Sequence, residues 1–409
     1  MSRKIPTCPE IPRLPKPKEL SYEINLLTPM FGGGVDAGKP DPTMPFRTTA
    51  IRGQLQFWWR ATAGASYSNV DDLIKKHSDI WGNTKGASKV KIVVENMHSG
   101  TPECFADQFR SSPGISYVLF PFVGKQPPAM FFPNGSFTLR IICPECFCAE
   151  VQTAVRAWVN FGGMGARTRR GCGSIFCKEL APRTVEEAAG LVRAILPDPP
   201  GGEPKWSILS GPLLAGNEGD PITAWDSAIG ALRKFRQGEG FARGLGRNGR
   251  PGRSRWPEPE TIRDITGRRS DRHQRMEGIP KNAFPRAELG LPIIFHFKDL
   301  GEPADTTLYP LVADEKYDRM ASPLIIKALG LANGKAVPIC LRLRTPVVET
   351  VQLDGNKNGN KVCLHKTDNL RGGYLATYPN SPMAGTPSGS ALDAFMNFIQ
   401  DEDTWDVLK

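Results

Sequence analysis

The first half of the chain alternates between the periods of a strand and a helix, which most constrains how it can fold. Apolar residues take every second position from 20 to 26, which predicts a strand over 19–27. Helical spacing predicts helices at 51–64, 69–80, 146–161 and 186–195. Further strands are predicted at 90–95, 116–122, 136–142 and 174–177. This sequence of elements is close to the βαββαβ order of a ferredoxin-like domain.

The second half repeats the alternation more loosely. Strands are predicted at 206–209, 291–297, 324–329 and 338–344, and helices at 222–237 and 390–401. The similarity of the two halves in sequence is too weak to prove a duplication. The predicted fold class is α+β, with two ferredoxin-like (RRM-like) domains that carry long insertions.

The length of 409 residues fits two domains. We expect four segments, namely a Pro-rich lead-in over 1–18, a first domain over 19–195, a linker over 196–205 and a second domain over 206–409. The second domain is expected to hold an Arg-rich insertion at 241–288.

The net charge of +10 favours a polyanionic partner. Residues 241–275 hold ten arginines against four carboxylates. This segment is either a solvated loop or an arm that becomes ordered on phosphate or on a protein partner. The sequence has no apolar run long enough to cross a membrane and no signal-peptide core, so we expect a cytoplasmic protein without a membrane partner. Its nine cysteines are then reduced thiols.

A tandem tryptophan lies in the helix predicted from "IRGQLQFWWRATAG". Helical spacing places Trp58 on the apolar stripe, so we expect it in the core. Trp59 falls on the border of that stripe, where it can shield the core edge or contact a ligand. Arg52 and Arg60 fall on the neighbouring face, which we expect to offer positive charge near the glycine loop before the helix.

The segment "FGGMGARTRRGCGS" at 161–174 interleaves five glycines with Arg167, Arg169 and Arg170. Glycine allows a backbone to approach a ligand closely, and arginine supplies forked donors for phosphate. The alternative is a glycine hairpin with solvated arginines. The segment is neither a Walker loop nor a dinucleotide fingerprint, because no Gly-Lys-Ser/Thr follows and a helix rather than a strand precedes it.

Together with "TPMFGGG" and "IRGQLQFWWRA", this segment resembles the RAMP superfamily of CRISPR ribonucleoproteins. Within it, the chain is most similar to the first-numbered subunits of type III-B Cmr effector complexes. The resemblance implies a non-catalytic RNA-binding subunit that holds the 3′ side of the guide RNA and helps to capture target RNA in antiviral defence. Guide RNA, target RNA and other Cmr subunits are the implied partners, and no cofactor or metal is expected. The candidate RNA-binding residues are Arg52, Trp59, Arg60, Gly162, Gly163, Gly165, Arg167, Arg169, Arg170, Gly171 and Gly173.

Two other functions remain open. A RAMP-type endoribonuclease that processes guide RNA without metal would need a catalytic side chain, and Asp36 could serve as one. We expect His296, inside a predicted strand, to be buried or hydrogen-bonded rather than catalytic. The third function is a basic scaffold that binds mainly protein. Cys143, Cys146 and Cys148 could form part of a zinc site if the fold brings Cys172 and Cys177 close, although free thiols are the default.

Overall fold

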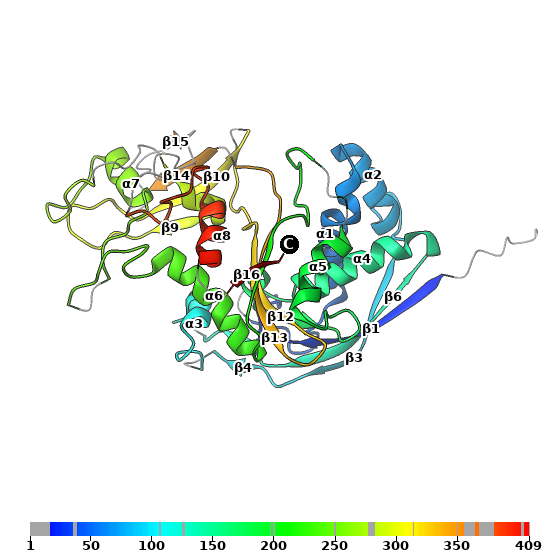
Figure 1. Cartoon of the computed structure of the whole chain (residues 1–409). Coiled ribbons are helices and arrows are strands. Elements are labelled where there is room, and N and C mark those ends of the chain that lie inside the picture. Colours follow the sequence, from blue (N-terminus) through cyan, green and yellow to red (C-terminus); the bar gives the residue numbers. More distant parts are fainter. Residues whose placement is uncertain are drawn as a thin grey trace, which may run out of the picture.

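The computed structural model describes residues 17–35, 39–105, 108–124, 127–196, 198, 201–248, 251–276, 283–313, 315–348, 350–355, 365–367, 380–401 and 405–408. Within them the chain forms a mixed α/β structure with four antiparallel sheets, which agrees with the predicted class (Figure 1). Among the helices described, none is both long and apolar enough to cross a membrane.

The first sheet is built from the first half of the chain. Its strands run in the order β3 (Lys91–Ser99), β6 (Gly135–Cys143), β1 (Lys18–Leu26) and β7 (Ile175–Phe176). The helices α1 (Thr48–Ala61), α2 (Val70–Trp81) and α4 (Glu145–Phe161) lie on one face of this sheet (Figure 1). The predicted alternation of β1 is confirmed, because the apolar side chains of Leu20, Tyr22 and Ile24 are buried on one face of the strand.

The second sheet has the same arrangement. Its strands run in the order β12 (Leu324–Gly330), β13 (Ala336–Arg342), β8 (Leu213–Gly216) and β16 (Trp405–Leu408). The helix α6 (Pro221–Gln237) follows β8, and α8 (Ala391–Asp401) precedes β16. In both sheets the four strands therefore lie in the order second, third, first, fourth along the chain.

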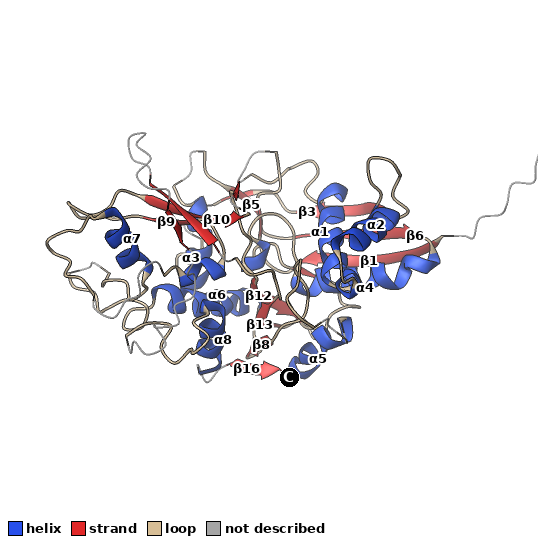
Figure 2. Ribbon diagram, turned by 90° about the horizontal axis from the view of Figure 1, so that it is seen from above, coloured by secondary structure: helices blue, strands red, loops and turns tan. Residues whose placement is uncertain are grey.

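Two smaller sheets are inserted into this frame. The strands β2 (Met30–Phe31), β5 (Met130–Phe132) and β4 (Glu103–Cys104) form one of them. The other contains β9 (Ile293–Phe295), β10 (Thr306–Val312), β11 (Glu315–Lys316), β14 (Thr350–Gly355) and β15 (His365–Thr367). The strands of this second insertion come from before β12 and from after β13, and they lie beyond α6 and α8 at the end opposite α2 (Figure 2).

The two halves share one apolar core. Trp58 and Trp158 of the first sheet's helices belong to the same buried cluster as Leu213 of β8 and Leu329 of β12. Trp206, which follows the predicted linker, also packs against this cluster. Side chains on both sides of 196–205 are therefore buried together.

Most predicted elements are confirmed, including α5 (Val185–Ile195), and two are wrong. Residues 116–122 form the end of helix α3 (Pro113–Leu119) and a 3-10 turn, Phe120–Phe122, instead of a strand. A short apolar run is compatible with both a buried helix and a strand. Pro113 at the first turn favours the helix, because proline is well tolerated there. Residues 206–209 form only an isolated bridge, from Ile208 to Arg344, and the strand begins at Leu213.

The prediction for Trp58 is confirmed, and the prediction that Trp59 lies on a border is wrong. Trp58 is 2% exposed and Trp59 is fully buried. The Trp59 indole N–H donates to Glu150 Oε2 of α4 at 2.9 Å, and its ring meets His77 of α2 edge-on. Two neighbouring helices thus cover the face of α1 that its own sequence leaves ambiguous, so Trp59 cannot stack on a base from this position.

The described part of the Arg-rich segment 241–275 is folded onto buried carboxylates. In α7 (Glu258–Thr266), Glu260 accepts from Arg253, from Arg263 Nη1 at 2.5 Å and from Arg269 Nη1 at 2.7 Å. Glu302 accepts from Arg263 Nε at 2.7 Å. Several of its arginines are therefore internal ion-pair partners, which corrects the interpretation of the segment as either a solvated loop or a free arm.

We predict that Trp59→Ala lowers the free energy of unfolding by about 3–5 kcal/mol, because it empties a large buried aromatic site. Ile74→Ala on the neighbouring α2 is the control, since that side chain is 56% exposed and should cost about 0.5 kcal/mol or less. Urea unfolding measures both. Equal costs for the two variants would contradict the buried position of Trp59.

We predict that Glu260→Gln destabilises the protein by about 3–5 kcal/mol, because three guanidinium groups lose their buried anion. Burial alone would raise the pKa of Glu260, but hydrogen bonds from Arg269 and Arg253 lower it to about 2. The carboxylate's contribution is present above its unfolded pKa of about 4.3 and is lost as the pH falls from there to about 2.

Urea unfolding between pH 7 and pH 2 checks this prediction. The difference between wild type and Glu260→Gln should shrink as the pH falls below about 4.3. Asp271→Asn, an exposed carboxylate in the same segment, is the matched control and should leave stability nearly unchanged. A pH-independent difference would argue against the ion-pair network as its cause.

Candidate nucleic-acid interface

A basic hollow lies where α3, α6 and the segment 161–174 meet. Its volume is about 650 Å³. It is lined by the side chains of Arg110, Arg167, Arg170, Arg233 and Arg236, and we call it the arginine pocket. Among the described residues that line it there is no Asp or Glu. Positive charge without carboxylates is the arrangement that attracts phosphate.

Helices α3 and α6 form one wall through a close contact. A Cβ at Gly114 would lie 2.3 Å from the carbonyl oxygen of Asp226, so only glycine allows α3 to approach α6 this closely. The Asp226 side chain accepts from the Ile115 amide at 2.9 Å and fixes the start of α3. Arg233 and Arg236 are three residues apart on α6, which places them on one face of the helix.

The segment 161–174 forms the opposite wall, and its three arginines have different roles. Arg169 donates to the carbonyl of Ser322 and lies over the ring of Phe57. Arg170 donates to the carbonyl of Leu324 at 2.7 Å. Arg167 adopts a left-handed backbone conformation and has an exposed side chain. Arg169 and Arg170 thus tie the first half of the chain to the second, and Arg167 is left to face the pocket.

The glycines of this segment make room for protein groups. A Cβ at Gly171 would lie 2.5 Å from the indole nitrogen of Trp225, which donates to the carbonyl of Arg170 at 2.7 Å. Comparable protein contacts under 3 Å occupy the Cβ positions of Gly162, Gly163, Gly165 and Gly173. At these positions the missing side chain makes room for the protein's own atoms, which is a structural reason for glycine here. That these glycines contact RNA stays a prediction.

A buried lysine fixes the same segment from the second sheet. Lys327 of β12 is fully buried, and its Nζ donates to the carbonyl of Gly162 at 2.8 Å. Burial lowers the pKa of Lys327 to about 7. Lys327 therefore belongs to the packing of the two halves and not to the pocket surface.

The guanidinium groups around the pocket repel one another. Desolvation, and then the charges of Arg236, Arg167 and Arg169, lower the pKa of Arg170 to about 10. The protein around the exposed Arg167 still desolvates its guanidinium and lowers its pKa, and Arg236 and Arg319 lower it further. All of these groups remain charged at neutral pH. A bound anion would relieve this repulsion.

Three of the pocket arginines have no partner among the described residues. Within the described part of the chain, the guanidinium groups of Arg167, Arg233 and Arg236 make no hydrogen bond or ion pair. Two aromatic residues of the α3 region, Tyr117 and Phe120, also line the pocket. Phe120 is 74% exposed. Unpaired arginines beside an exposed aromatic ring are typical of single-stranded RNA-binding surfaces.

The structure does not bring Arg52 and Arg60 to this pocket. Arg52 Nη1 donates to Ser88 Oγ at 3.0 Å, and Arg60 Nη1 lies 3.4 Å from His77 Nε2. Their helix α1 lies beside α2 on the first sheet (Figure 1). Both arginines face neighbouring elements of the first sheet instead of the glycine segment.

Sequence reasoning missed Arg233, Arg236, Tyr117 and Phe120. Both arginines lie in the helix predicted at 222–237, and the motif "RKFR" within it was the available signal. Tyr117 and Phe120 fell in a segment predicted as a strand. Their proximity to Arg167 depends on the packing of α3 on α6, for which the sequence pattern carries no signal.

The other predicted chemical groups do not converge on a site. Cys143 Sγ and Cys148 Sγ lie 3.2 Å apart, and Cys146 is exposed. No three His, Cys, Asp or Glu side chains of the described residues are grouped so that they could hold a metal ion. His296 is exposed and lies 3.1 Å from Asp305, and Asp36 lies outside the described residues.

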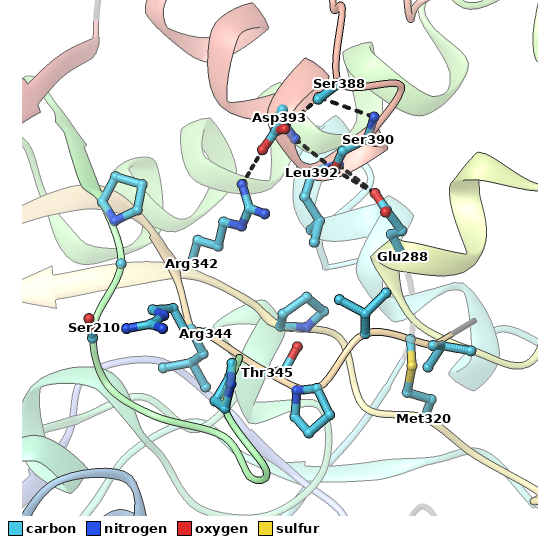
Figure 3. Close-up of a pocket in the computed structure, with 18 of the residues that line it drawn as sticks. Ser210, Glu288, Met320, Arg342, Arg344, Thr345, Ser388, Ser390, Leu392 and Asp393 are labelled. Carbon is cyan, nitrogen blue, oxygen red and sulfur yellow. Dashed lines mark hydrogen bonds and ion pairs between the residues drawn. The ribbon is translucent and has the colours of Figure 1, made fainter. Parts of the chain in front are cut away.

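A second cavity, of about 370 Å³, lies between β13, α8 and the segment 343–348 (Figure 3). Its lining contains two arginines and two carboxylates, Arg342, Arg344, Glu288 and Asp393. Arg342 contacts Asp393, and Glu288 Oε2 accepts from Ser390 Oγ at 2.6 Å. Since its charges are already compensated, this cavity has less attraction for an anion than the arginine pocket.

Comparison with known structures finds a protein of similar fold. The crystal structure of apo Cmr1 from Pyrococcus furiosus matches with a TM-score of 0.53 and 16% sequence identity, over 84% of this chain and 92% of that one. At this identity the match concerns the fold alone.

Comparison with known sequences finds two similar proteins and one family match. The chain is 25% identical over 179 residues to the CRISPR system Cmr subunit Cmr1-2 of Pyrococcus furiosus, which covers 38% of this chain and 94% of that protein. It is 27% identical over 147 residues to Cmr1-1 of the same organism, which covers 34% of this chain and 43% of that protein. Residues 23–176, from β1 to β7, match the RAMP superfamily, which confirms the resemblance predicted from the sequence motifs.

Proposed function

We propose that this protein is a non-catalytic RNA-binding subunit of a type III-B CRISPR (Cmr) effector complex in the cytoplasm. The arginine pocket is the observation that carries the proposal. Three unpaired guanidinium groups converge in it without a lining carboxylate among the described residues. The similarity of part of the chain to CRISPR Cmr subunits supports the choice of RNA as the polyanion.

The strand order supports two ferredoxin-like domains. In each half, a helix follows the first strand and another precedes the fourth, and the order second, third, first, fourth agrees with a βαββαβ unit. We infer that the domains comprise roughly 19–195 and 206–409, and that they pack on each other where the segment 161–174 meets β12. The shared core makes them one packed body and not two independent modules.

Within the complex, we infer that the subunit holds the 3′ side of the guide RNA and helps to capture target RNA beside other Cmr subunits. The contacts would be mainly to phosphates, because guanidinium groups dominate the pocket. Such contacts position an RNA strand without reading its sequence. They suit a subunit that must accept many different guides.

We predict that Arg233→Ala combined with Arg236→Ala weakens binding of a single-stranded RNA roughly ten- to hundredfold, since two charge-assisted contacts are lost. The slope of log affinity against log salt should fall by roughly 0.7 for each lost phosphate contact. Fluorescence titrations at several salt concentrations measure both quantities.

The control is Arg183→Ala combined with Arg193→Ala. Arg183 lies just before α5, and Arg193 lies in it. It removes the same net charge from exposed positions outside the pocket. It should change affinity far less than the pocket variant. If both double variants weaken binding equally, only net charge matters and the pocket is not the RNA site.

We also predict that labelled RNA stays intact when it is incubated with the purified protein in EDTA. None of the described residues that line the pocket is a His, Asp or Glu that could act as a general base. Gel electrophoresis measures cleavage. Fragments that appear with wild type and vanish with a single His or Asp variant would instead support the endoribonuclease alternative.

A further inference from the structure

We propose that the arginine pocket binds the terminal phosphomonoester of an RNA strand, with the terminal base against Phe120. This inference rests on the proposed RNA-binding function and narrows the ligand from any phosphate of the backbone to a phosphorylated end. The shared chemistry is a phosphomonoester, which either a 5′ or a 3′ end can carry.

The charge of the pocket favours a dianion. Arg167, Arg233 and Arg236 have no partners among the described residues, and Arg170 adds a fourth positive charge. An internal phosphodiester carries one negative charge, whereas a phosphomonoester carries about 1.5 to 2 at neutral pH and has an additional acceptor oxygen. A terminal phosphate therefore compensates more of the repulsion among these groups.

The size of the pocket fits one compact group. Its volume of about 650 Å³ lies within the usual range of about 300–1,000 Å³ for pockets that enclose small ligands. A nucleotide at a chain end has a phosphate, a sugar and a base with one free face. That group can enter a hollow with the rest of the strand outside.

The aromatic edge of the pocket supplies the missing stacking partner. Phe120 is exposed, while Phe122, two residues later, is 8% exposed and stacks on Phe31 at 5.2 Å. Phe122 thus anchors the turn that presents Phe120. A terminal base lacks a neighbour on one face, and an aromatic ring can occupy that face without reading the sequence.

The test compares three RNAs of one sequence, namely one with hydroxyls at both ends, one with a 5′-phosphate and one with a 3′-phosphate. The full chain is titrated with each by fluorescence anisotropy. We expect one phosphorylated RNA to bind roughly tenfold more tightly than the RNA with two hydroxyl ends, which is about 1.4 kcal/mol. The end that shows the gain identifies the source of the phosphate.

Variants assign the gain to the pocket. The Arg236→Ala variant should bind the phosphorylated RNA no more tightly than the unphosphorylated one. The Phe120→Ala variant should bind the phosphorylated RNA severalfold more weakly than wild type. Arg193→Ala on α5 should preserve the gain. Melting temperatures of all variants confirm folding, which we expect to be unaffected because the Arg236 side chain makes no hydrogen bond or ion pair to the described residues.

The failures of the two proposals are distinguishable. Equal affinity for all three RNAs would overturn the terminal-phosphate inference and leave general RNA binding standing. A phosphate gain that survives in Arg236→Ala would place the phosphate elsewhere and also overturn it. No binding of any RNA would overturn the proposed function itself.

Discussion

The junction between the segment 161–174 and strand β12 is the contact on which the rest of the structure depends. Arg170 donates to the Leu324 carbonyl at one end of β12, and Lys327 in the same strand donates to the Gly162 carbonyl. These bonds satisfy buried carbonyl groups that water cannot reach, so losing them would be costly. They join the two sheets and hold Arg167 at the edge of a hollow.

Arginine has two separate roles in this protein. A guanidinium group beside a buried carboxylate stabilises the fold, and one without a carboxylate beside it can bind an anion. For the arginines of the segment 241–275, Glu260 within the segment and Glu302 outside it neutralise guanidinium groups, and the chain folds around them. Around the arginine pocket, no described lining residue offers a carboxylate. Arginines of the segment 241–275 are thus ion-paired within the fold, whereas arginines of the pocket are available to bind an anion.

The elements that form the pocket come from three distant parts of the chain. Helix α3 lies in the first half, α6 lies in the second, and the segment 161–174 lies between them in sequence. The close contact of Gly114 with α6 sets the distance between α3 and α6. The pocket is therefore a property of the packing between halves and not of either half alone.

The sequence alone determined the long strands of the first sheet, the principal helices and the resemblance to RAMP proteins, because periodicity and local motifs encode them. It did not determine the short strands of the two inserted sheets or the helix at 113–119. It also singled out Arg167, which lines the pocket. Only the tertiary structure decided that Trp59 is buried, that the glycines face protein, and that Arg233 and Arg236 join Arg167. These outcomes depend on which helix covers which face, and local periodicity specifies a face without specifying its partner.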